Sequence, residues 1–422
     1  MRIDELKKDI IIKKNVRYFD FTASALALKS VEKEIRKILL TYANTHSDSS
    51  LHSFLTQKHY EKAKQSIRKS LNLSDDFALI ACGTGASGAI KKFQELLGLY
   101  VPPLIKQKYF QNIKPKDLPL VFVGPYEHHS NEVSFREALC ECLRVPLNEN
   151  LEIDFDFFEK ALEQNKGRKL IFSFSLASNV TGILSDYERI YALAKKYKAI
   201  LAFDAASFIA YKNIECKYYD ALFISTHKLL GGVASCGLLV IKKDLCYSKP
   251  SFAAGGTVSY VSKSSVNYLC DVEALEEGGT PGILQLIRAS LAFQKRDEIG
   301  FKLIESKSKL LKEYFFKEAE KIPNLKLYAE HLKNRLCIFA LNIEGISPFD
   351  LAYTLSKYYK IESRAGCDCA GPYGHDLLGL KDGEGLKTKP GWLRISLHYT
   401  QEIEDLKYFF DSLKKSIARL SF

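Results

Sequence analysis

Short apolar runs alternate with amphipathic stretches along much of the chain. From Phe77 onward, runs such as FALIACG, PLVFVG, KLIFSFSL, AILAFDAA, ALFIST and GLLVIKK have the length and composition of strands buried on both faces. Helical patterns such as GAIKKFQELLG and SDYERIYALAKKYK separate several of these runs. The alternation predicts an α/β domain with a mainly parallel sheet, whose ligands bind where strands give way to loops.

The pattern changes after about Pro281. A long helical stretch is followed by the strand-like RLCIFALNI, a helix near SPFDLAYTLSKYY, the strand GWLRISLHY and a last helix, for which Thr400 is the predicted cap. This order is typical of a smaller α+β domain. The loop KDGEGLKTKPG, residues 381–391, is the clearest candidate for a flexible segment. We expect a large domain and a small domain, with these boundaries: 18–295 for the large one, and 1–17 with 296–422 for the small one.

Composition narrows the classes of protein that the chain can represent. With 422 residues, 46% of them hydrophobic, the chain is long enough to bury a substantial core. It has no apolar run of membrane-spanning length and no recognisable secretion signal, so we expect a cytoplasmic protein that does not bind a membrane. Its ten cysteines are then expected to stay reduced. The net charge of +11 is spread along the chain, which argues against nucleic-acid binding.

Two charged residues at predicted strand ends suggest cofactor chemistry. Asp204 ends the run AILAFD, and Lys228 lies in STHKLLGG, just after the next strand. An amine and a carboxylate placed in this way can serve opposite ends of one pyridine ring: the amine condenses with an aldehyde, and the carboxylate keeps the ring nitrogen protonated. Either residue alone would more simply be a partner in a surface ion pair.

The segment IACGTGASGAI runs from a predicted strand into a predicted helix. Its backbone amides can bind a phosphate at the positive end of the helix, although a packing turn or a nucleotide loop would look similar. Ser225 and His227, just before the lysine, can add side-chain donors to the same phosphate. The predicted phosphate-binding amides are those of Gly83, Thr84, Gly85 and Ala86.

A series of motifs gives the chain a family resemblance. YFDFTASALA, NTHSDSS, EHHSN, SNVTG, DAAS, STHKLLGG, AAGGTVSY, EEGGTP and RAGCDCAGP occur in the order seen in class-V aminotransferase-like enzymes, from about residue 18 to the C-terminus. Within that family the chain resembles the cysteine desulfurases and selenocysteine lyases. The resemblance implies pyridoxal 5'-phosphate as cofactor and a fold-type I architecture with a mainly parallel, seven-stranded type of sheet. It also implies a homodimer with active sites at the subunit interface.

The resemblance assigns roles to the residues that match the family motifs. Lys228 would form the Schiff base with the cofactor and Asp204 would pair with the ring nitrogen. His128, also a candidate catalytic residue, would stack on the ring face opposite Ala206. Further cofactor contacts are implied for Asn179 at the ring hydroxyl, for Ser207, which replaces the family's usual glutamine, for Thr84, Ser225 and His227 at the phosphate, and for Thr257, reaching across from the partner subunit.

The substrate end of the site is assigned in the same way. Cys369 in RAGCDCAGP would be the nucleophile that takes sulfur from the substrate, which requires its thiolate. Arg394 in GWLRISLHY would bind the substrate carboxylate, with His46 and Asn179 as further substrate contacts. Cys367 is better explained as a small apolar side chain. The trio Cys367, Cys369 and His375 lacks the spacing of a zinc site, so no metal is predicted.

The function implied by the resemblance is desulfuration of L-cysteine to L-alanine, leaving a persulfide on Cys369 for a sulfur-acceptor protein or a reductant to discharge. Other members of the same family are alternatives: a carbon–sulfur lyase, a selenocysteine lyase or an aminotransferase would not require Cys369. A non-catalytic scaffold is a different class of alternative. The joint presence of Lys228, Asp204 and Arg394 argues against it.

Overall fold

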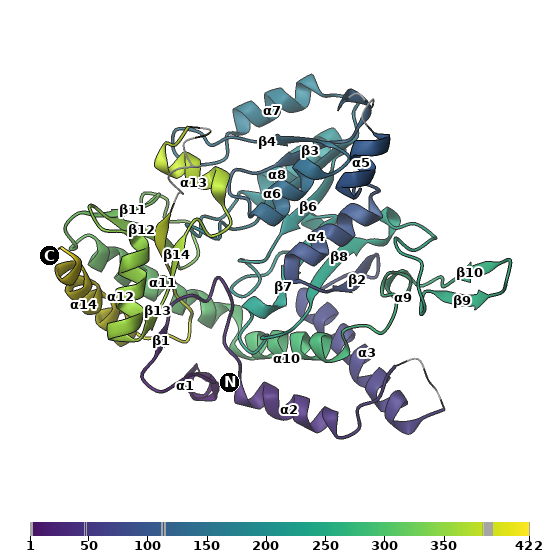
Figure 1. The fold of residues 1–422 in the computed structure, drawn as a ribbon, viewed down its shortest axis with the longest axis horizontal. Coiled ribbons are helices and arrows are strands. Elements are labelled where there is room, and N and C mark those ends of the chain that lie inside the picture. The colour runs from purple at the N-terminus through teal and green to yellow at the C-terminus, as the bar shows by residue number, and fades with distance from the viewer. Residues whose placement is uncertain are drawn as a thin grey trace.

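The computed structural model of the protein describes residues 3–45, 47, 49–110, 113, 115–381, 383 and 391–421. Its largest sheet has seven strands, and both flanks of this sheet carry helices (Figure 1). The strands lie in the order β2 (Phe77–Cys82), β8 (Gly237–Lys242), β7 (Ala221–Ser225), β6 (Ile200–Asp204), β5 (Leu170–Ser175), β3 (Leu120–Val123) and β4 (Glu141–Arg144). Within this sheet β8 is antiparallel to both of its neighbours, and all the other pairings are parallel. The prediction of an α/β fold with a mainly parallel sheet is therefore confirmed.

The continuous apolar runs form strands because both faces of the sheet are covered. Successive residues of a strand point to opposite faces, and β2 shows this plainly: Leu79 belongs to one buried apolar cluster, whereas Ala78 and Ile80 belong to another. Among the covering helices are α4 (Gly85–Leu96), which packs on β8 and β7, α6 (His129–Glu137), α7 (Phe155–Gln164), α8 (Tyr187–Tyr197) and α10 (Ile283–Ile299), which packs on α3 (Leu51–Leu71).

A second, antiparallel sheet contains strands from the C-terminal third of the chain. Its order is β11 (Leu325–Leu327), β12 (Ile338–Ile343), β15 (Trp392–Ser396) and β14 (Arg364–Gly366). A separate apolar cluster forms between it and the helices α11 (Phe301–Ala319), α12 (Pro348–Tyr359) and α14 (Ile403–Leu420). The N-terminal strand β1 (Arg17–Tyr18) pairs with β13 (Ile361–Glu362), so the chain start lies beside this region. The domain boundaries given above stay a prediction.

The start of α14 differs from the prediction that Thr400 caps this helix. Glu402 is the N-cap, and its side chain and that of Asp405 each accept a hydrogen bond from the other residue's backbone N–H. Thr400 Oγ1 instead lies 2.8 Å from His398 Nδ1. A reciprocal capping box satisfies two otherwise unpaired amides, which explains why the helix begins later.

The remaining elements lie around these two sheets. The hairpin of β9 (Val258–Val261) and β10 (Val266–Tyr268) projects from the body of the molecule (Figure 1). Within the described part of the chain, no helix is both long enough and apolar enough to cross a membrane. Residues 382 and 384–390 of the predicted flexible loop are not among those described. The other helices are α1 (Ile3–Asp9), α2 (Lys29–Leu39), α5 (Pro103–Tyr109), α9 (Val272–Glu276) and α13 (Gly371–Leu378).

Candidate active site

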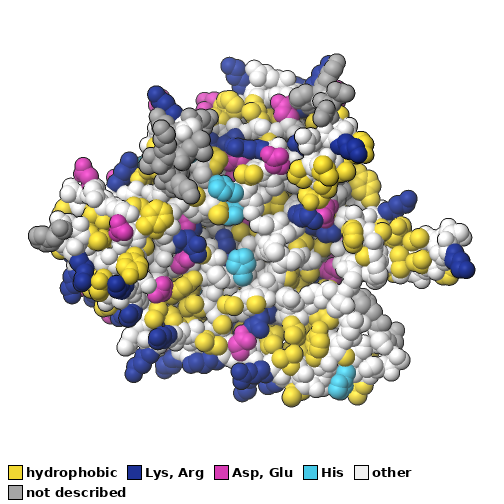
Figure 2. Space-filling model, in the orientation of Figure 1, with side chains coloured by type: hydrophobic (Ala, Val, Ile, Leu, Met, Phe, Trp, Pro, Cys, Tyr) yellow, Lys and Arg dark blue, Asp and Glu magenta, His cyan; other side chains and the backbone are white. Residues whose placement is uncertain are grey.

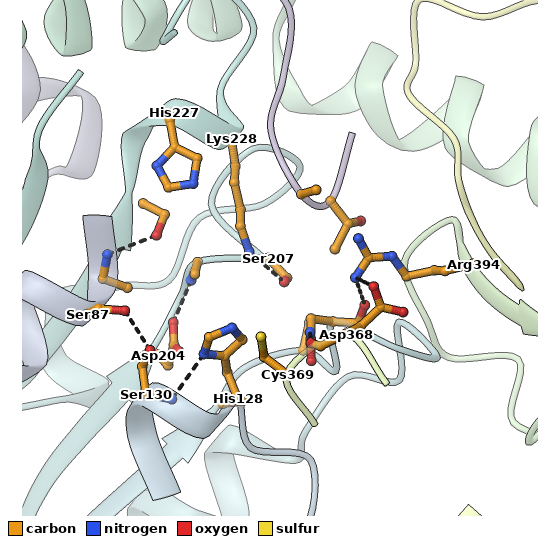
Figure 3. Close-up of a pocket in the computed structure, with 18 of the residues that line it drawn as sticks. Ser87, His128, Ser130, Asp204, Ser207, His227, Lys228, Asp368, Cys369 and Arg394 are labelled. Carbon is orange, nitrogen blue, oxygen red and sulfur yellow. Dashed lines mark hydrogen bonds and ion pairs between the residues drawn. The ribbon is translucent and has the colours of Figure 1, made fainter. Parts of the chain in front are cut away.

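Lys228 and Asp204 lie in one cavity of about 290 Å³ at the strand ends. Asp204 is the last residue of β6, and Lys228 closes a short turn directly after β7. Because β6 and β7 are parallel neighbours, their carboxyl ends meet at the same edge of the sheet. Lys228 Nζ lies 3.5 Å from Ser207 Oγ, to which it donates a hydrogen bond, as Figure 3 shows.

Burial shifts the pKa of both residues in the direction that favours the uncharged form. It lowers the pKa of Lys228 to about 8, although the nearby Asp204 carboxylate acts in the opposite direction. Burial likewise raises the pKa of Asp204, opposed by the hydrogen bond that Ala206 N–H donates to its Oδ1 at 2.8 Å. Removing a charge from water favours its neutral form in both cases. The Lys228 amine is therefore much easier to deprotonate than that of an exposed lysine.

His128 enters the same cavity from the start of α6. It is the N-cap of this helix, and its Nδ1 accepts a hydrogen bond from Ser130 N–H at 3.1 Å. Burial, reinforced by the positive charge of Lys228, lowers the pKa of His128 to about 4. The ring is consequently neutral at physiological pH, and its proton lies on Nε2 because Nδ1 is an acceptor.

The start of α4 forms a small cradle of hydrogen-bond donors beside the lysine. Ser225 Oγ accepts a hydrogen bond from Ala86 N–H at 2.9 Å, which ties β7 to this helix. Gly85 has a φ of +59°, and a Cβ there would lie 2.9 Å from His227 Cε1 and 3.0 Å from Ser225 Oγ. Only glycine fits this position without displacing its neighbours. Thr84 is the N-cap residue, and it lines the cavity with Ala86, Ser225 and His227.

Arg394, on β15, lies at the other end of the cavity and is almost fully buried. Its Nη2 donates to Asp20 Oδ1 at 2.9 Å, and its Nη1 donates to the Asn179 carbonyl at 3.0 Å. Arg394 Nη1 also lies 3.1 Å from Asp368 Oδ1. The predicted carboxylate receptor is therefore already flanked by two carboxylates.

Three charged residues of this region escaped the sequence interpretation. Asp20, Asp368 and Arg364 lie around Arg394, and Arg364 Nη2 lies 2.9 Å from Asp20 Oδ2. The only sequence signal for them was their presence in YFDFTASALA and RAGCDCAGP, two of the motifs that carry the resemblance. A charged residue within a motif does not reveal with which distant residue it forms an ion pair.

Cys369 lies on the turn between β14 and α13 and lines the cavity. Its side chain is exposed, and in Figure 3 it stands between His128 and Asp368, facing the side from which Lys228 enters. The turn is pinned by His129 N–H, which donates to the Cys369 carbonyl at 2.7 Å. Cys367 is partly buried and packs against the largest apolar cluster. Within the described residues, no three His, Cys, Asp or Glu side chains gather as a metal site would require.

Gly83, Gly85 and Thr257, three of the predicted site residues, are not among the residues that line this cavity. Thr257 is buried elsewhere, where its Oγ1 donates to the Ala254 carbonyl at 2.7 Å. Its predicted role at the partner subunit's cofactor stays a prediction. His46 lies outside the described residues. The cavity brings together these other predicted residues: Thr84, Ala86, His128, Asn179, Asp204, Ala206, Ser207, Ser225, His227, Lys228, Cys369 and Arg394.

Comparison with known proteins identifies the family. The family model described as aminotransferase class-V matches residues 17–409. This chain belongs to the class-V aminotransferase family. A probable cysteine desulfurase of Pyrococcus abyssi is 26% identical to this class-V protein over 434 aligned positions, covering 100% of this chain and 99% of its relative. A probable cysteine desulfurase of Staphylococcus epidermidis is 25% identical, covering 85% of this chain and 84% of its relative.

Solved structures agree with the fold of this class-V protein. The apo structure of a cysteine desulfurase from Thermococcus onnurineus has a TM-score of 0.83 at 24% identity, covering 100% of this chain and 99% of that one. The cysteine desulfurase CsdA from Escherichia coli has a TM-score of 0.81 at 21% identity, with the same coverage. These likenesses confirm the fold-type I architecture.

The class-V family uses pyridoxal phosphate, and the cavity of this class-V protein fits that group. The Ser225 hydroxyl, which accepts from Ala86 N–H and keeps its own proton to donate, lies at the positive end of a 12-residue helix, where an anion is stabilised. The buried Asn179 Oδ1 has no hydrogen-bond partner among the described residues, and it borders the same cavity. A buried acceptor of this kind is costly unless a ligand supplies a donor such as a ring hydroxyl.

Proposed function

We propose that this class-V protein is a pyridoxal-phosphate-dependent cysteine desulfurase that converts L-cysteine to L-alanine and a persulfide on Cys369. The observation that carries the proposal is the presence of Lys228, Cys369 and Arg394 in one cavity. An amine with a lowered pKa, an exposed thiol and a guanidinium are the three groups that this reaction requires. Full-length similarity to two probable cysteine desulfurases supports the same conclusion.

Two groups of residues that line the cavity would hold the cofactor. Thr84, Ser225 and His227 would bind its phosphate, while Asp204 would pair with the ring nitrogen. When bound, the cofactor supplies an electron sink next to the α-carbon of the amino acid. The neutral His128 ring can stack on the pyridine without placing a second positive charge beside the protonated nitrogen.

The chain's own residues would then carry the reaction steps. Arg394 binds and orients the substrate carboxylate, and Lys228 removes the α-proton as the neutral amine. The Cys369 thiolate attacks the substrate sulfur: an S–S bond forms, the substrate C–S bond breaks, and the β-carbon gains a proton. Atoms and electrons balance without an added oxidant, because two thiols become one persulfide and one C–H bond. A reductant or an acceptor thiol must then release the sulfur from Cys369.

Product analysis tests this proposal directly. The protein loaded with pyridoxal phosphate and given L-cysteine with a thiol reductant should release L-alanine and sulfide in equal amounts. Formation of pyruvate in place of alanine would move the protein to the carbon–sulfur lyases. A requirement for a 2-oxo acid would identify an aminotransferase, and rapid turnover of L-selenocysteine with none of L-cysteine would identify a selenocysteine lyase.

The lowered pKa of Lys228 predicts how cofactor loading depends on pH. Condensation with the aldehyde needs the neutral amine, and a pKa of about 8 places the gain of that form near pH 8. The loading rate of cofactor-free protein should therefore rise about tenfold from pH 7 to pH 9 and then level off. Stopped-flow absorbance measures this rate. A rate that keeps rising beyond pH 10 would contradict the expectation, and pyridoxamine phosphate, which has no aldehyde, is the control ligand.

The proposal also includes a sulfur-acceptor protein as partner and a cytoplasmic location. It further includes a homodimer, for which the hairpin of β9 and β10 is the candidate contact. The projecting hairpin carries exposed apolar side chains, among them Tyr260 and Val261, each 56% exposed. Figure 2 shows apolar side chains along this arm, whereas Lys and Arg are scattered over the same view of the molecule. A second copy covering the hairpin would bury these side chains and bring Thr257 close to the subunit interface.

A further inference from the structure

The charges around Arg394 pose a problem for an anionic substrate. Two arginines, Arg364 and Arg394, face two carboxylates, Asp20 and Asp368, so the group carries no net formal charge. An arriving amino-acid carboxylate would add a third negative charge to this group. Arg394 and Asp368 are both deeply buried, so a like charge placed beside them is poorly screened by solvent. One of the two resident carboxylates must therefore give way, or the substrate binds weakly.

Asp20 is the more firmly held of the two carboxylates. Its Oδ1 accepts a hydrogen bond from Arg394 Nη2 at 2.9 Å. Its Oδ2 accepts from Arg364 Nε at 3.0 Å and lies 2.9 Å from Arg364 Nη2. Two guanidinium groups thus grip one carboxylate, which is the strong form of such a contact.

Asp368 holds Arg394 much less well. Its Oδ1 lies 3.1 Å from Arg394 Nη1, but this buried oxygen has no partner with hydrogen-bond geometry among the described residues. Its other oxygen accepts a hydrogen bond from Trp392 Nε1 at 2.7 Å, a contact that does not depend on the arginine. Burial also raises the pKa of Asp368, which disfavours its charged form. On the arginine side, the buried Arg394 Nε likewise has no hydrogen-bond partner among the described residues.

We infer that Asp368 competes with the substrate carboxylate for Arg394 and is displaced from it when the amino acid binds. The inference rests on the proposed function for the identity of the substrate, and it makes Asp368 a positioning residue that sets substrate affinity. Asp368 is the neighbour of Cys369, and both have left-handed φ values, 54° and 56°. Because Asp368 and Cys369 lie on the same turn, displacement of Asp368 by the substrate carboxylate acts on the segment that carries the Cys369 thiol.

The test uses Asp368→Asn, which removes the charge but keeps an oxygen for Trp392. L-Alanine, the proposed product, is titrated by calorimetry into the cofactor-loaded full chain. Its dissociation constant should fall about tenfold, the size expected when one poorly screened like charge is removed. The KM for L-cysteine should fall by a similar factor. Asp368→Ala, a second variant without the carboxylate, should tighten L-alanine in the same direction.

Two controls separate competition from a general change in the site. Asp376→Asn removes a carboxylate that pairs with Arg144, outside the cavity, and should leave L-alanine affinity unchanged. Ethylamine, which is alanine without its carboxylate, should bind the wild type and Asp368→Asn equally. Unchanged or weaker L-alanine binding in both Asp368 variants would overturn the inference, as would an equal gain for ethylamine.

The titration also separates this inference from the proposed function, since L-alanine and ethylamine are bound without desulfuration. If the wild type forms no alanine from cysteine, yet Asp368→Asn tightens L-alanine, the desulfurase proposal fails and the role of Asp368 stands. If the wild type is an active desulfurase and both Asp368 variants bind L-alanine no more tightly, the role of Asp368 fails alone.

Discussion

Lys228→Ala is expected to abolish alanine formation from L-cysteine, with kcat falling by about 10³-fold, within the range that a positioned general base contributes. The same change removes the amine that attaches the cofactor. Both losses follow from one side chain, because Lys228 lines the cavity and its lowered pKa makes the neutral amine available. Amino-acid analysis measures the product. Borohydride reduction followed by peptide mass spectrometry locates the covalent link, which should be at Lys228 in the wild type and absent in the variant.

The matched control is Lys212→Ala. Lys212 is a half-exposed lysine that pairs with Glu305 and does not line the cavity. The Lys212→Ala protein should retain the activity of the wild type and its covalent link to the cofactor. A Lys228→Ala protein that keeps more than a tenth of the wild-type kcat, with the cofactor covalently attached elsewhere, would show that another amine does this work.

Cys369→Ala should eliminate cysteine-dependent alanine and sulfide while leaving cofactor binding intact. The expected fall in kcat is at least about 10³-fold, because removing the attacking nucleophile of an enzyme typically costs that much or more. Cofactor absorption should be unchanged, since Cys369 lies on the turn after β14, away from the phosphate cradle at the start of α4. Trapping with a thiol-specific alkylating reagent during turnover should find the persulfide sulfur on Cys369 in the wild type.

Cys367→Ala is the closest available control, because it removes a thiol two residues away on the same segment. Cys367 is partly buried against the apolar cluster, so this variant should lose little activity. Full activity of Cys369→Ala would exclude the persulfide route and favour a family member that does not use this thiol. Equal loss in both variants would point to damage of the turn instead of loss of the nucleophile.

The main sheet could be predicted from the sequence because most of its strands are apolar runs, whereas β4, with the sequence ECLR, was not among the predicted strands. Runs such as KLIFSFSL are too short for typical helices and too continuously apolar for a sheet with one wet face, which leaves a strand covered on both sides. The start of α14 could not be predicted as well. Thr400 and Glu402 are both able to cap a helix, and the choice depended on the Glu402–Asp405 capping box and on the packing of Thr400 against His398.

By itself, the sequence placed Asp204 at the end of one predicted strand and Lys228 just after the next, at strand ends where ligands of a parallel sheet bind. The structure then showed that these two strands, β6 and β7, are parallel neighbours. Only the tertiary structure decided what surrounds Asp204 and Lys228. The pKa of Lys228 depends on desolvation by many distant segments, which no local pattern records. Arg394 and Asp20, which form an ion pair, are 374 positions apart in the chain. The contact of Arg394 with Asp368 joins strand β15 to the turn between β14 and α13. Motifs therefore indicated the reactive groups, while folding set their charges and partners.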